Sequence, residues 1–187
     1  MTRDNPGALT ARLRIEPLCP DHAPLLFDAL ADEAIYSYIP DAPHPSVDSL
    51  ARRYALLECG APEGAGEVWL NWALQRSDTG AYIGTLQATV VPESRAFIGY
   101  VLTPSAWGRG YAREACRWLV DELQTRYAVD EILASVDARN LRSARLLEHL
   151  GFERIGAAAA EIRGEITTDF RYRLGRGAPA RRVTPPA

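Results

Sequence analysis

Apolar residues along this chain follow two patterns, strict alternation in some segments and a spacing of three or four positions in others. Alternation, as at Leu13 and Ile15, is typical of a half-buried strand, whereas the longer spacing is typical of a helix with one buried face. These patterns predict strands at 11–18, 68–75, 81–91, 95–102 and 131–137, and a hairpin-like pair of strands within 152–174. They predict helices at 19–32, 46–60, 112–127 and 140–151.

The order of these elements predicts an α/β fold in which helices flank a mixed sheet. The short connections at 76–80 and 92–94 favour an antiparallel meander of three strands. The strand at 95–102, the helix after it and the strand at 131–137 form a crossover unit, which places these two strands parallel. We therefore expect a mostly antiparallel sheet of about seven strands with a central parallel pair.

The two ends of the chain differ in composition from the body. Residues 1–10 are polar, and residues 175–187 combine glycine, proline and arginine without apolar periodicity. Both segments are expected to be flexible tails. Residues 11–174 are expected to form one domain, long enough to bury a substantial core.

Composition and charge exclude several classes of protein. The chain of 187 residues is 47% hydrophobic and 24% charged, with a formal net charge of −3, as in soluble globular proteins. The negative charge argues against nonspecific binding to nucleic acid, which depends on phosphate neutralisation. No segment approaches the ~18 uninterrupted apolar residues of a membrane span, and the N-terminus lacks an apolar signal-like region. We expect a cytoplasmic protein without nucleic-acid or membrane partners.

The cysteines and histidines do not follow the spacing of a metal site. Cys19, Cys59 and Cys116 are far apart and odd in number, so neither a disulfide framework nor a CxxC metal site is predicted, and reduced, buried thiols are expected. The histidines lack HExxH or related spacing, and we expect them at the surface or at helix ends. The sequence therefore predicts no bound metal.

The segment 107–115, WGRGYAREA, places two glycines directly before a predicted helix. Glycine is a poor helix former, so these residues indicate a sharp bend or a close approach by another group. A helix N-terminus carries unpaired N–H groups and a partial positive charge, and a glycine-rich turn in front of it creates an anion site. Gly108 and Gly110 would clear that approach, and Arg109 would add a positive charge. A plain connecting turn is the other interpretation of the motif.

Two nucleotide-binding motifs do not match this loop. It lacks the GK[ST] of a P-loop, and it lacks the third glycine of the GxGxxG dinucleotide fingerprint, near which Glu114 stands instead.

The wider context of the loop resembles a known family. GYVLTPSAWGRGYAREACRWLVDEL, followed by a strand and by NLRSARLLEHLGF, resembles the GNAT superfamily of acyl-CoA-dependent N-acetyltransferases, and most closely its RimJ/RimL-like branch. The resemblance runs over most of residues 11–174 and is most specific at 107–115 and 140–152. It implies the GNAT fold, acetyl-CoA as cosubstrate and an amine as acceptor.

The resemblance also implies which residues hold the cofactor. In the family a Q/R-x-x-G-x-G/A loop binds the pyrophosphate of acetyl-CoA through backbone N–H groups, and Trp107 stands here in place of the usual Gln or Arg. The implied pyrophosphate-binding residues are Gly108, Arg109, Gly110, Tyr111 and Ala112.

Further residues are implied around the thioester. In the family the strand GYVL splays from its parallel neighbour, and a backbone N–H near Val101 or Leu102 faces the thioester carbonyl. Asn140 is a favoured helix N-cap, and the resemblance adds a hydrogen bond to the pantetheine arm. The RimJ/RimL-like pattern N-x-x-S is matched by Asn140 and Ser143, whose hydroxyl is implied to protonate or hydrogen-bond the coenzyme A sulfur. A serine that bonds backbone in the first turn of its helix is the alternative.

Two catalytic groups of many GNAT enzymes are absent from this sequence. Leu147 stands where those enzymes carry a tyrosine acid, and Phe97 stands where a strand-borne glutamate base precedes IGY. The sequence therefore identifies no strong general base. The open candidates are Asp32, Glu33, Tyr36 and Glu93, or a water held by Asn71, Thr85 or Gln87.

The sequence thus predicts an N-acetyltransferase that moves acetyl from acetyl-CoA to a primary amine by direct attack in a ternary complex. The acceptor is a protein N-terminus or a small amine such as a polyamine, aminoglycoside or amino-acid derivative, and the enzyme is a monomer or homodimer. The alternative is a noncatalytic acyl-CoA-binding or sensing module, which the two missing catalytic groups support.

Overall fold

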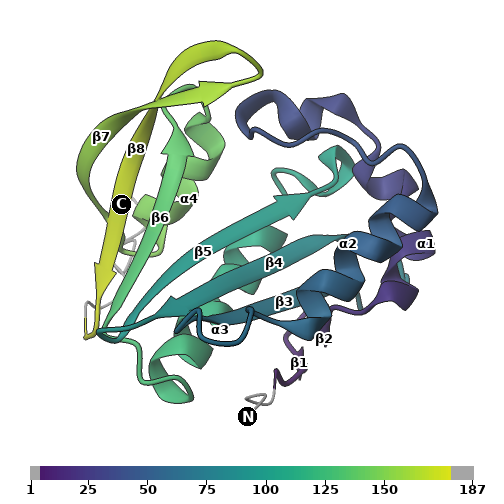
Figure 1. The fold of residues 1–187 in the computed structure, drawn as a ribbon, viewed down its shortest axis with the longest axis horizontal. Coiled ribbons are helices and arrows are strands. Elements are labelled where there is room, and N and C mark those ends of the chain that lie inside the picture. The colour runs from purple at the N-terminus through teal and green to yellow at the C-terminus, as the bar shows by residue number, and fades with distance from the viewer. Residues whose placement is uncertain (1–4, 178–187) are drawn as a thin grey trace, which may run out of the picture.

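The computed structural model describes residues 5–177, which form one eight-stranded sheet with helices on both faces (Figure 1). The strands are β1 (Ala8–Leu9), β2 (Leu13–Pro17), β3 (Val68–Arg76), β4 (Tyr82–Val91), β5 (Arg95–Leu102), β6 (Glu131–Asp137), β7 (Glu153–Ile162) and β8 (Glu165–Gly175). The α-helices are α1 (Ala23–Leu26), α2 (Val47–Cys59), α3 (Tyr111–Thr125) and α4 (Leu141–His149). The 3-10 helices are η1 (Pro20–His22), η2 (Asp28–Leu30), η3 (Glu33–Tyr38) and η4 (Pro104–Ala106).

The strand order in the sheet is β1-β2-β3-β4-β5-β6-β8-β7. Every neighbouring pair is antiparallel except β5 and β6, which are parallel. The α/β class and the central parallel pair are therefore confirmed. The sheet has one strand more than the sequence predicts, because β1 lies in the segment that was expected to be a tail.

The parallel pair separates after three residues. β5 and β6 are paired at 95–97 and 131–133, and their pairing ends at Phe97 and Leu133. Beyond that point β5 stays paired with β4 as far as Leu102, while β6 stays paired with β8 as far as Asp137. The two strands consequently diverge toward their carboxyl ends (Figure 1), and the sheet is open at its centre.

Helices cover the two faces of the sheet, with α3 and α4 on one face and α1 and α2 on the other (Figure 1). On α3, Ala115, Leu119 and Leu123 recur at intervals of four and are fully buried, so one helix face packs on the sheet. α2 begins at the Ser46 cap and ends at Gly60, as its sequence predicts. The second core, under α1 and α2, includes buried Leu26 and Leu50.

The predicted helix at 19–32 is wrong as a continuous element. The chain forms the short turns η1, α1 and η2 there, of which α1 has four residues. Pro20 and Pro24 each stand in the first turn of a new segment, and a proline has no N–H with which to continue a preceding helix. Leu26 and Leu30 are buried, whereas Leu25 is 53% exposed.

The expected N-terminal tail is also wrong in part. Ala8 and Leu9 form β1 and pair with Ile15 and Arg14 of β2. A strand of two residues is too short to show alternation, so the sequence pattern gives no signal for it. At the other end β8 continues to Gly175. Residues 1–4 and 178–187 lie outside the described residues.

Two expectations about the whole chain concern membranes and cysteines. No helix within residues 5–177 combines the length and apolar character that a membrane crossing requires.

The three cysteines are free. Cys116 is buried as expected and Cys19 is half-buried, whereas the expectation of a buried thiol is wrong for Cys59, which is exposed on the last turn of α2.

Candidate cofactor and catalytic site

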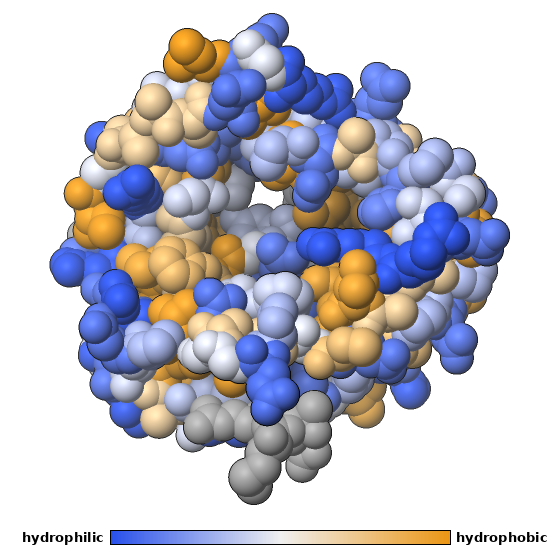
Figure 2. Space-filling model, in the orientation of Figure 1, coloured by the Kyte–Doolittle hydropathy of each residue, from blue (hydrophilic) through white to orange (hydrophobic). Residues whose placement is uncertain are grey.

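The opening between β5 and β6 is the place where the predicted site residues meet. Figure 2 shows the molecule hollowed at the centre of this view, with a gap that passes through it where the two strands diverge in Figure 1. β5 leads through η4 into the N-terminus of α3, and β6 leads through a short turn into the N-terminus of α4. Two helix N-termini, each with unpaired N–H groups and a partial positive charge, therefore follow the open ends of the strands.

The glycine loop before α3 adopts a conformation that requires glycine. Gly108 and Gly110 have φ of +71° and +80°, and Gly110 is the N-cap of α3 without a side chain to cap it. No protein atom lies within 4 Å of the place where a Gly108 Cβ would stand. Within the described part of the chain, the N–H groups of Gly108, Arg109 and Gly110 find no backbone acceptor. Free N–H groups beside an exposed arginine fit the pyrophosphate of a coenzyme A molecule.

Trp107 joins the loop to both sides of the opening. Its indole Nε1 donates to the carbonyl oxygen of Leu102 at 2.7 Å, which fixes the end of β5. The guanidinium of Arg142, in the first turn of α4, lies over the Trp107 ring at 4.7 Å from its centre. The indole thus has a structural role at the place where the family carries Gln or Arg. Sequence reasoning missed Arg142, a cation that contacts the loop at Trp107, because its partner lies in a distant segment.

The register of β5 decides between Val101 and Leu102 as the N–H that faces the opening. The N–H of Thr103 donates to the carbonyl of Ile83 on the β4 side at 2.8 Å. In an antiparallel ladder alternate residues turn their N–H toward the same neighbour, so the N–H of Val101 also faces β4. The N–H of Leu102 then faces the opposite side, which is the side of the opening. The geometry therefore favours Leu102 over Val101.

A buried carboxylate organises the turn from β6 into α4. Asp137 accepts hydrogen bonds from the backbone N–H of Arg139 at 2.8 Å and from its Nε and Nη2 at 2.9 and 2.8 Å. The side chain of Arg139 lowers the pKa of Asp137 below its ordinary value. In the next turn, Asn140 Oδ1 accepts from the Ser143 N–H at 3.1 Å, which confirms Asn140 as the N-cap. A contact between its amide and the pantetheine arm stays a prediction.

The hydroxyl of Ser143 has a partner that the sequence did not reveal. Tyr100 Oη lies 2.5 Å from Ser143 Oγ. Burial raises the pKa of Tyr100 well above its ordinary value, so the phenol stays protonated. Tyr100 belongs to the GYVL segment, whose role was assigned to the backbone alone. Leu147, at the place of the family tyrosine, is fully buried, and the tyrosine that reaches this site comes from β5 instead.

The three candidate water-holding residues lie on the opposite face of the sheet from Tyr100. The strand register aligns Asn71 of β3 with Gln87 of β4, and Gln87 with Gly99 of β5. A Cβ at Gly99 would stand 2.8 Å from Gln87 Nε2, so the glycine leaves room for this amide. Thr85 shares the face because it lies two residues before Gln87 on β4. These polar groups therefore gather beside the opening.

The carboxylate and tyrosine candidates for the base are placed differently. Glu93 pairs with Arg95 at 2.8 Å in the β4–β5 turn, at the end of β5 opposite the opening, so its nomination is wrong. Asp32 caps η3 by accepting from the Ala34 N–H at 2.9 Å. Tyr36 is buried and donates to the carbonyl of Leu30. Glu33 is exposed in the first turn of η3.

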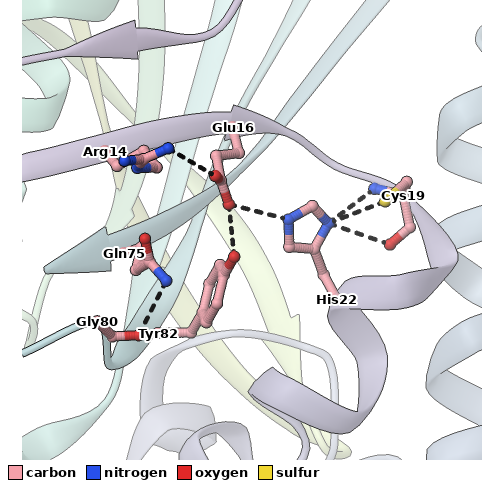
Figure 3. Close-up of polar contacts among 7 residues, drawn as sticks. All are labelled: Arg14, Glu16, Cys19, His22, Gln75, Gly80 and Tyr82. Carbon is pink, nitrogen blue, oxygen red and sulfur yellow. Dashed lines mark hydrogen bonds and ion pairs between the residues drawn. The ribbon is translucent and has the colours of Figure 1, made fainter. Parts of the chain in front are cut away.

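A second polar cluster joins β2, η1 and β4 (Figure 3). Tyr82 donates to Glu16 Oε2 at 2.5 Å, and His22 Nε2 lies 3.4 Å from the same oxygen. The N–H of Cys19 donates to His22 Nδ1 at 3.1 Å, which leaves Nε2 to donate to Glu16. Burial raises the pKa of Tyr82 to about 12. His22 is buried and is the last residue of η1, which agrees with the expected helix-end position.

Among residues 5–177 there is no group of three or more His, Cys, Asp or Glu side chains arranged to hold a metal ion.

Comparison with known proteins gives the family. The sequence profile described as "Acetyltransferase (GNAT) domain" matches residues 12–153, which include the glycine loop and Ser143. This protein belongs to the GNAT acetyltransferase family. The GNAT match covers most of the chain, and the RimJ/RimL-like branch of the resemblance is confirmed with it. GNAT enzymes use acetyl-CoA as the acetyl donor.

Related proteins support the same family. The uncharacterized N-acetyltransferase p20 of Bacillus licheniformis is 27% identical over 149 residues, which is 79% of this chain and 82% of the relative. Mycobacterium smegmatis RimJ, solved in complex with CoA-disulfide, has a TM-score of 0.78 at 20% identity and covers 88% of this chain and 82% of its own. Spermidine N-acetyltransferase from Vibrio cholerae, solved with CoA and spermine, has a TM-score of 0.75 at 19% identity, over 90% and 98% of the two chains. These likenesses establish the GNAT fold.

Proposed function

We propose that this GNAT protein transfers acetyl from acetyl-CoA directly to a primary amine within the opening between β5 and β6. The observation that carries the proposal is the arrangement of the two flanks of this opening. One flank ends in a loop with free N–H groups at Gly108–Gly110, and the other begins with the Ser143 hydroxyl. The anion site on one flank would therefore bind the pyrophosphate of acetyl-CoA, and the hydroxyl donor on the other flank would face the sulfur of the same molecule.

The loop would hold the cofactor by its pyrophosphate. Gly108, Arg109 and Gly110 offer N–H groups, the start of α3 adds Tyr111 and Ala112, and the helix dipole favours the negative charge. The side chain of Tyr111 is buried, so this residue would contribute its backbone. From there the pantetheine arm would run along the free edge of β5 toward Asn140.

The N–H of Leu102 would stabilise the charge that develops on the thioester carbonyl. When the amine nitrogen attacks the carbonyl carbon, the oxygen takes up negative charge in the tetrahedral intermediate. A fixed N–H donor aimed at that oxygen is typically worth about 10²–10³-fold in rate. The C–S bond then breaks, and the sulfur leaves as thiolate while the nitrogen gives up its proton.

Ser143 would assist the departing sulfur. An alcohol is a much weaker acid than a thiol, so the hydroxyl stabilises the thiolate mainly by donating a hydrogen bond to it. Tyr100 remains protonated and can donate to Ser143 Oγ, which directs the serine proton away from the tyrosine and toward the cofactor. The pair is therefore set up as a short chain of donors that ends at the sulfur.

Removal of the amine proton would fall to water on the opposite face of the sheet. Asn71, Thr85 and Gln87 present amide and hydroxyl groups there, and the lack of a side chain at Gly99 leaves room for the Gln87 amide. Such groups orient water but are poor bases themselves. The acceptor would therefore enter from this face and bind partly as the neutral amine, which requires only a weak base.

The acceptor class follows from the amine chemistry and the family relatives. Both a protein N-terminus and a polyamine present a primary amine, and two structural neighbours, the ribosomal-protein-S5-alanine acetyltransferase from Vibrio fischeri and the spermidine N-acetyltransferase, are named for a protein and a polyamine substrate. The acceptor would therefore be an N-terminal amine or a small polyamine.

Release of coenzyme A with a panel of amines tests the function. Purified protein is incubated with acetyl-CoA and, separately, N-terminal peptides, polyamines, aminoglycosides and amino-acid derivatives, and free thiol and acetylated product are both quantified. At least one amine should give thiol and N-acetyl product in equal amounts. Tight binding of acetyl-CoA with no turnover on any amine would instead support the noncatalytic sensing module, which the absence of the family tyrosine and glutamate favours.

A further inference from the structure

Arg12, in the turn between β1 and β2, makes separate contacts with the start of α3. Its Nη1 donates to the carbonyl oxygen of Arg109 at 2.9 Å. Its Nε donates to Glu114 Oε2 at 2.7 Å, and its guanidinium lies over the Tyr111 ring at 4.6 Å from the centre. A guanidinium presents its N–H groups in a rigid plane, so a carbonyl and a carboxylate bound at the same time fix its position.

Glu114 anchors this arginine to the helix. Its Oε1 accepts from the Arg12 backbone N–H at 2.8 Å and from the Thr10 hydroxyl at 2.6 Å. Burial alone would raise the pKa of Glu114, but the hydrogen bonds from Thr10 and Arg12 outweigh it and lower the pKa. The carboxylate therefore stays ionised at neutral pH and holds the turn against α3.

The contact with Arg109 sets the direction of one N–H in the glycine loop. In a trans peptide the C=O of one residue and the N–H of the next point in opposite directions. Because the Arg109 carbonyl is turned toward Arg12, the N–H of Gly110 is turned away from it, and no described backbone group accepts it. We propose that Arg12 is a positioning residue that fixes this peptide so that the Gly110 N–H faces the pyrophosphate. The inference rests on the proposed role of the loop in acetyl-CoA binding.

The neighbouring Arg76 separates positioning from simple charge. Its guanidinium lies 5.6 Å from the centre of the same Tyr111 ring, but its Nη2 is paired with Asp78 at 2.6 Å. Loss of Arg76 removes a positive charge close to the loop and leaves the Arg109 carbonyl untouched. Conversely, Arg12→Lys keeps the charge and loses the rigid fork that serves two acceptors.

Calorimetry with two ligands tests the positioning role. Coenzyme A carries the pyrophosphate and the 3′-phosphoadenosine, and pantetheine lacks both, so a variant that changes only the Kd of coenzyme A acts on this part of the cofactor. In Arg12→Lys the affinity for coenzyme A should fall about tenfold or more, as for a lost hydrogen bond to a charged group, while the affinity for pantetheine stays unchanged. In Arg76→Gln both affinities should match the wild type. Wild-type affinity for coenzyme A in Arg12→Lys, or equal losses for both ligands, would overturn the inference.

A second variant covers the case in which Arg12→Lys does not fold. Glu114→Gln keeps the shape of the anchor and removes its charge. It should therefore weaken the binding of coenzyme A but not of pantetheine, and by less than Arg12→Lys does. No selective loss in folded Glu114→Gln would then overturn the inference. The wild type itself reports on the proposed function, because equal affinity for the two ligands would mean that the loop does not bind pyrophosphate at all. If the wild type prefers coenzyme A to pantetheine and both variants keep the same preference, the result contradicts only the role of Arg12.

Discussion

The hydroxyl groups of Tyr100 and Ser143 lie 2.5 Å apart at the junction of β5 and α4, although 43 positions separate the two residues in the chain. The contact joins β5 to α4, the helix that follows β6, and β5 and β6 are the two strands that diverge. It therefore ties together the two flanks of the opening at the point where the thioester sulfur would lie. The catalytic role proposed for Ser143 depends on this partner.

Replacement of Ser143 by alanine should separate turnover from binding. If the hydroxyl assists the departing thiolate, kcat falls about tenfold or more at pH 7, because a hydrogen bond to a charged group is worth about 1.5–3 kcal/mol. The affinity for coenzyme A changes little, since the assistance acts in the transition state. A kcat within a few-fold of wild type at pH 7 would exclude the role.

Replacement of Tyr100 by phenylalanine should act through the serine. The variant keeps the partly buried ring and removes one hydroxyl, so kcat should fall by less than in Ser143→Ala. In the double variant Tyr100→Phe/Ser143→Ala, kcat should be no lower than in Ser143→Ala alone, because two groups that act as a unit are not additive. Steady-state kinetics of the four proteins gives this comparison. Multiplicative losses would show that the tyrosine acts independently of Ser143.

Asn140 has a confirmed capping role, so a variant that keeps the cap isolates the predicted cofactor contact. Serine caps helices about as well as asparagine, whereas alanine costs about 1 kcal/mol of stability. Asn140→Ser should therefore keep the Tm of the wild type and still bind coenzyme A more weakly, because the side-chain amide is gone. Asn140→Ala should have both a lower Tm and a weaker affinity for coenzyme A. If Asn140→Ser binds coenzyme A with wild-type affinity in calorimetry, the residue is a cap alone.

The buried Asp137 should make stability depend on acid pH. Its pKa is lowered in the folded state by the Arg139 side chain, so its contribution is present above the unfolded pKa of about 3.9 and is lost as the pH falls through the lower folded value. Asp137→Asn lacks this contribution. The free energy of unfolding, measured with urea between pH 3 and 7, should differ most between the two proteins near pH 7 and converge toward pH 3. A constant difference over this range would contradict the assignment.

Local patterns in the sequence predicted the elements that the structure contains. The helices α2, α3 and α4 follow apolar spacing and caps such as Ser46 and Asn140, which act within a few residues. The strand β1 and the break at Pro24 were missed, since two residues cannot show a period and the apolar pattern runs across the proline. The glycine loop was found because its conformation depends on Gly108 and Gly110 themselves.

The contacts that complete the site could not be predicted in this way. Tyr100 meets Ser143 across 43 positions, and Arg12 reaches the Arg109 carbonyl across 97. Pairs this distant leave no mark in the periodicity of either segment, and they form only when the sheet brings the segments together. Which backbone N–H faces the opening, that of Leu102 or that of Val101, likewise depends on the strand register. A shift of the register by one residue would reverse the assignment.

Titration of coenzyme A into Gly110→Asp tests most directly that the glycine loop is the cofactor site. A carboxylate at this position would repel the pyrophosphate and crowd the loop, since the Cβ would stand 3.4 Å from Arg12 Nη2. Gly164→Asp, in the β7–β8 turn, is the control for the added charge and the backbone strain, because Gly164 has φ of +83° against +80° at Gly110. By calorimetry, the wild type and Gly164→Asp should bind coenzyme A with the same affinity, and folded Gly110→Asp should show no binding. Wild-type affinity in folded Gly110→Asp would contradict the placement of acetyl-CoA on this loop.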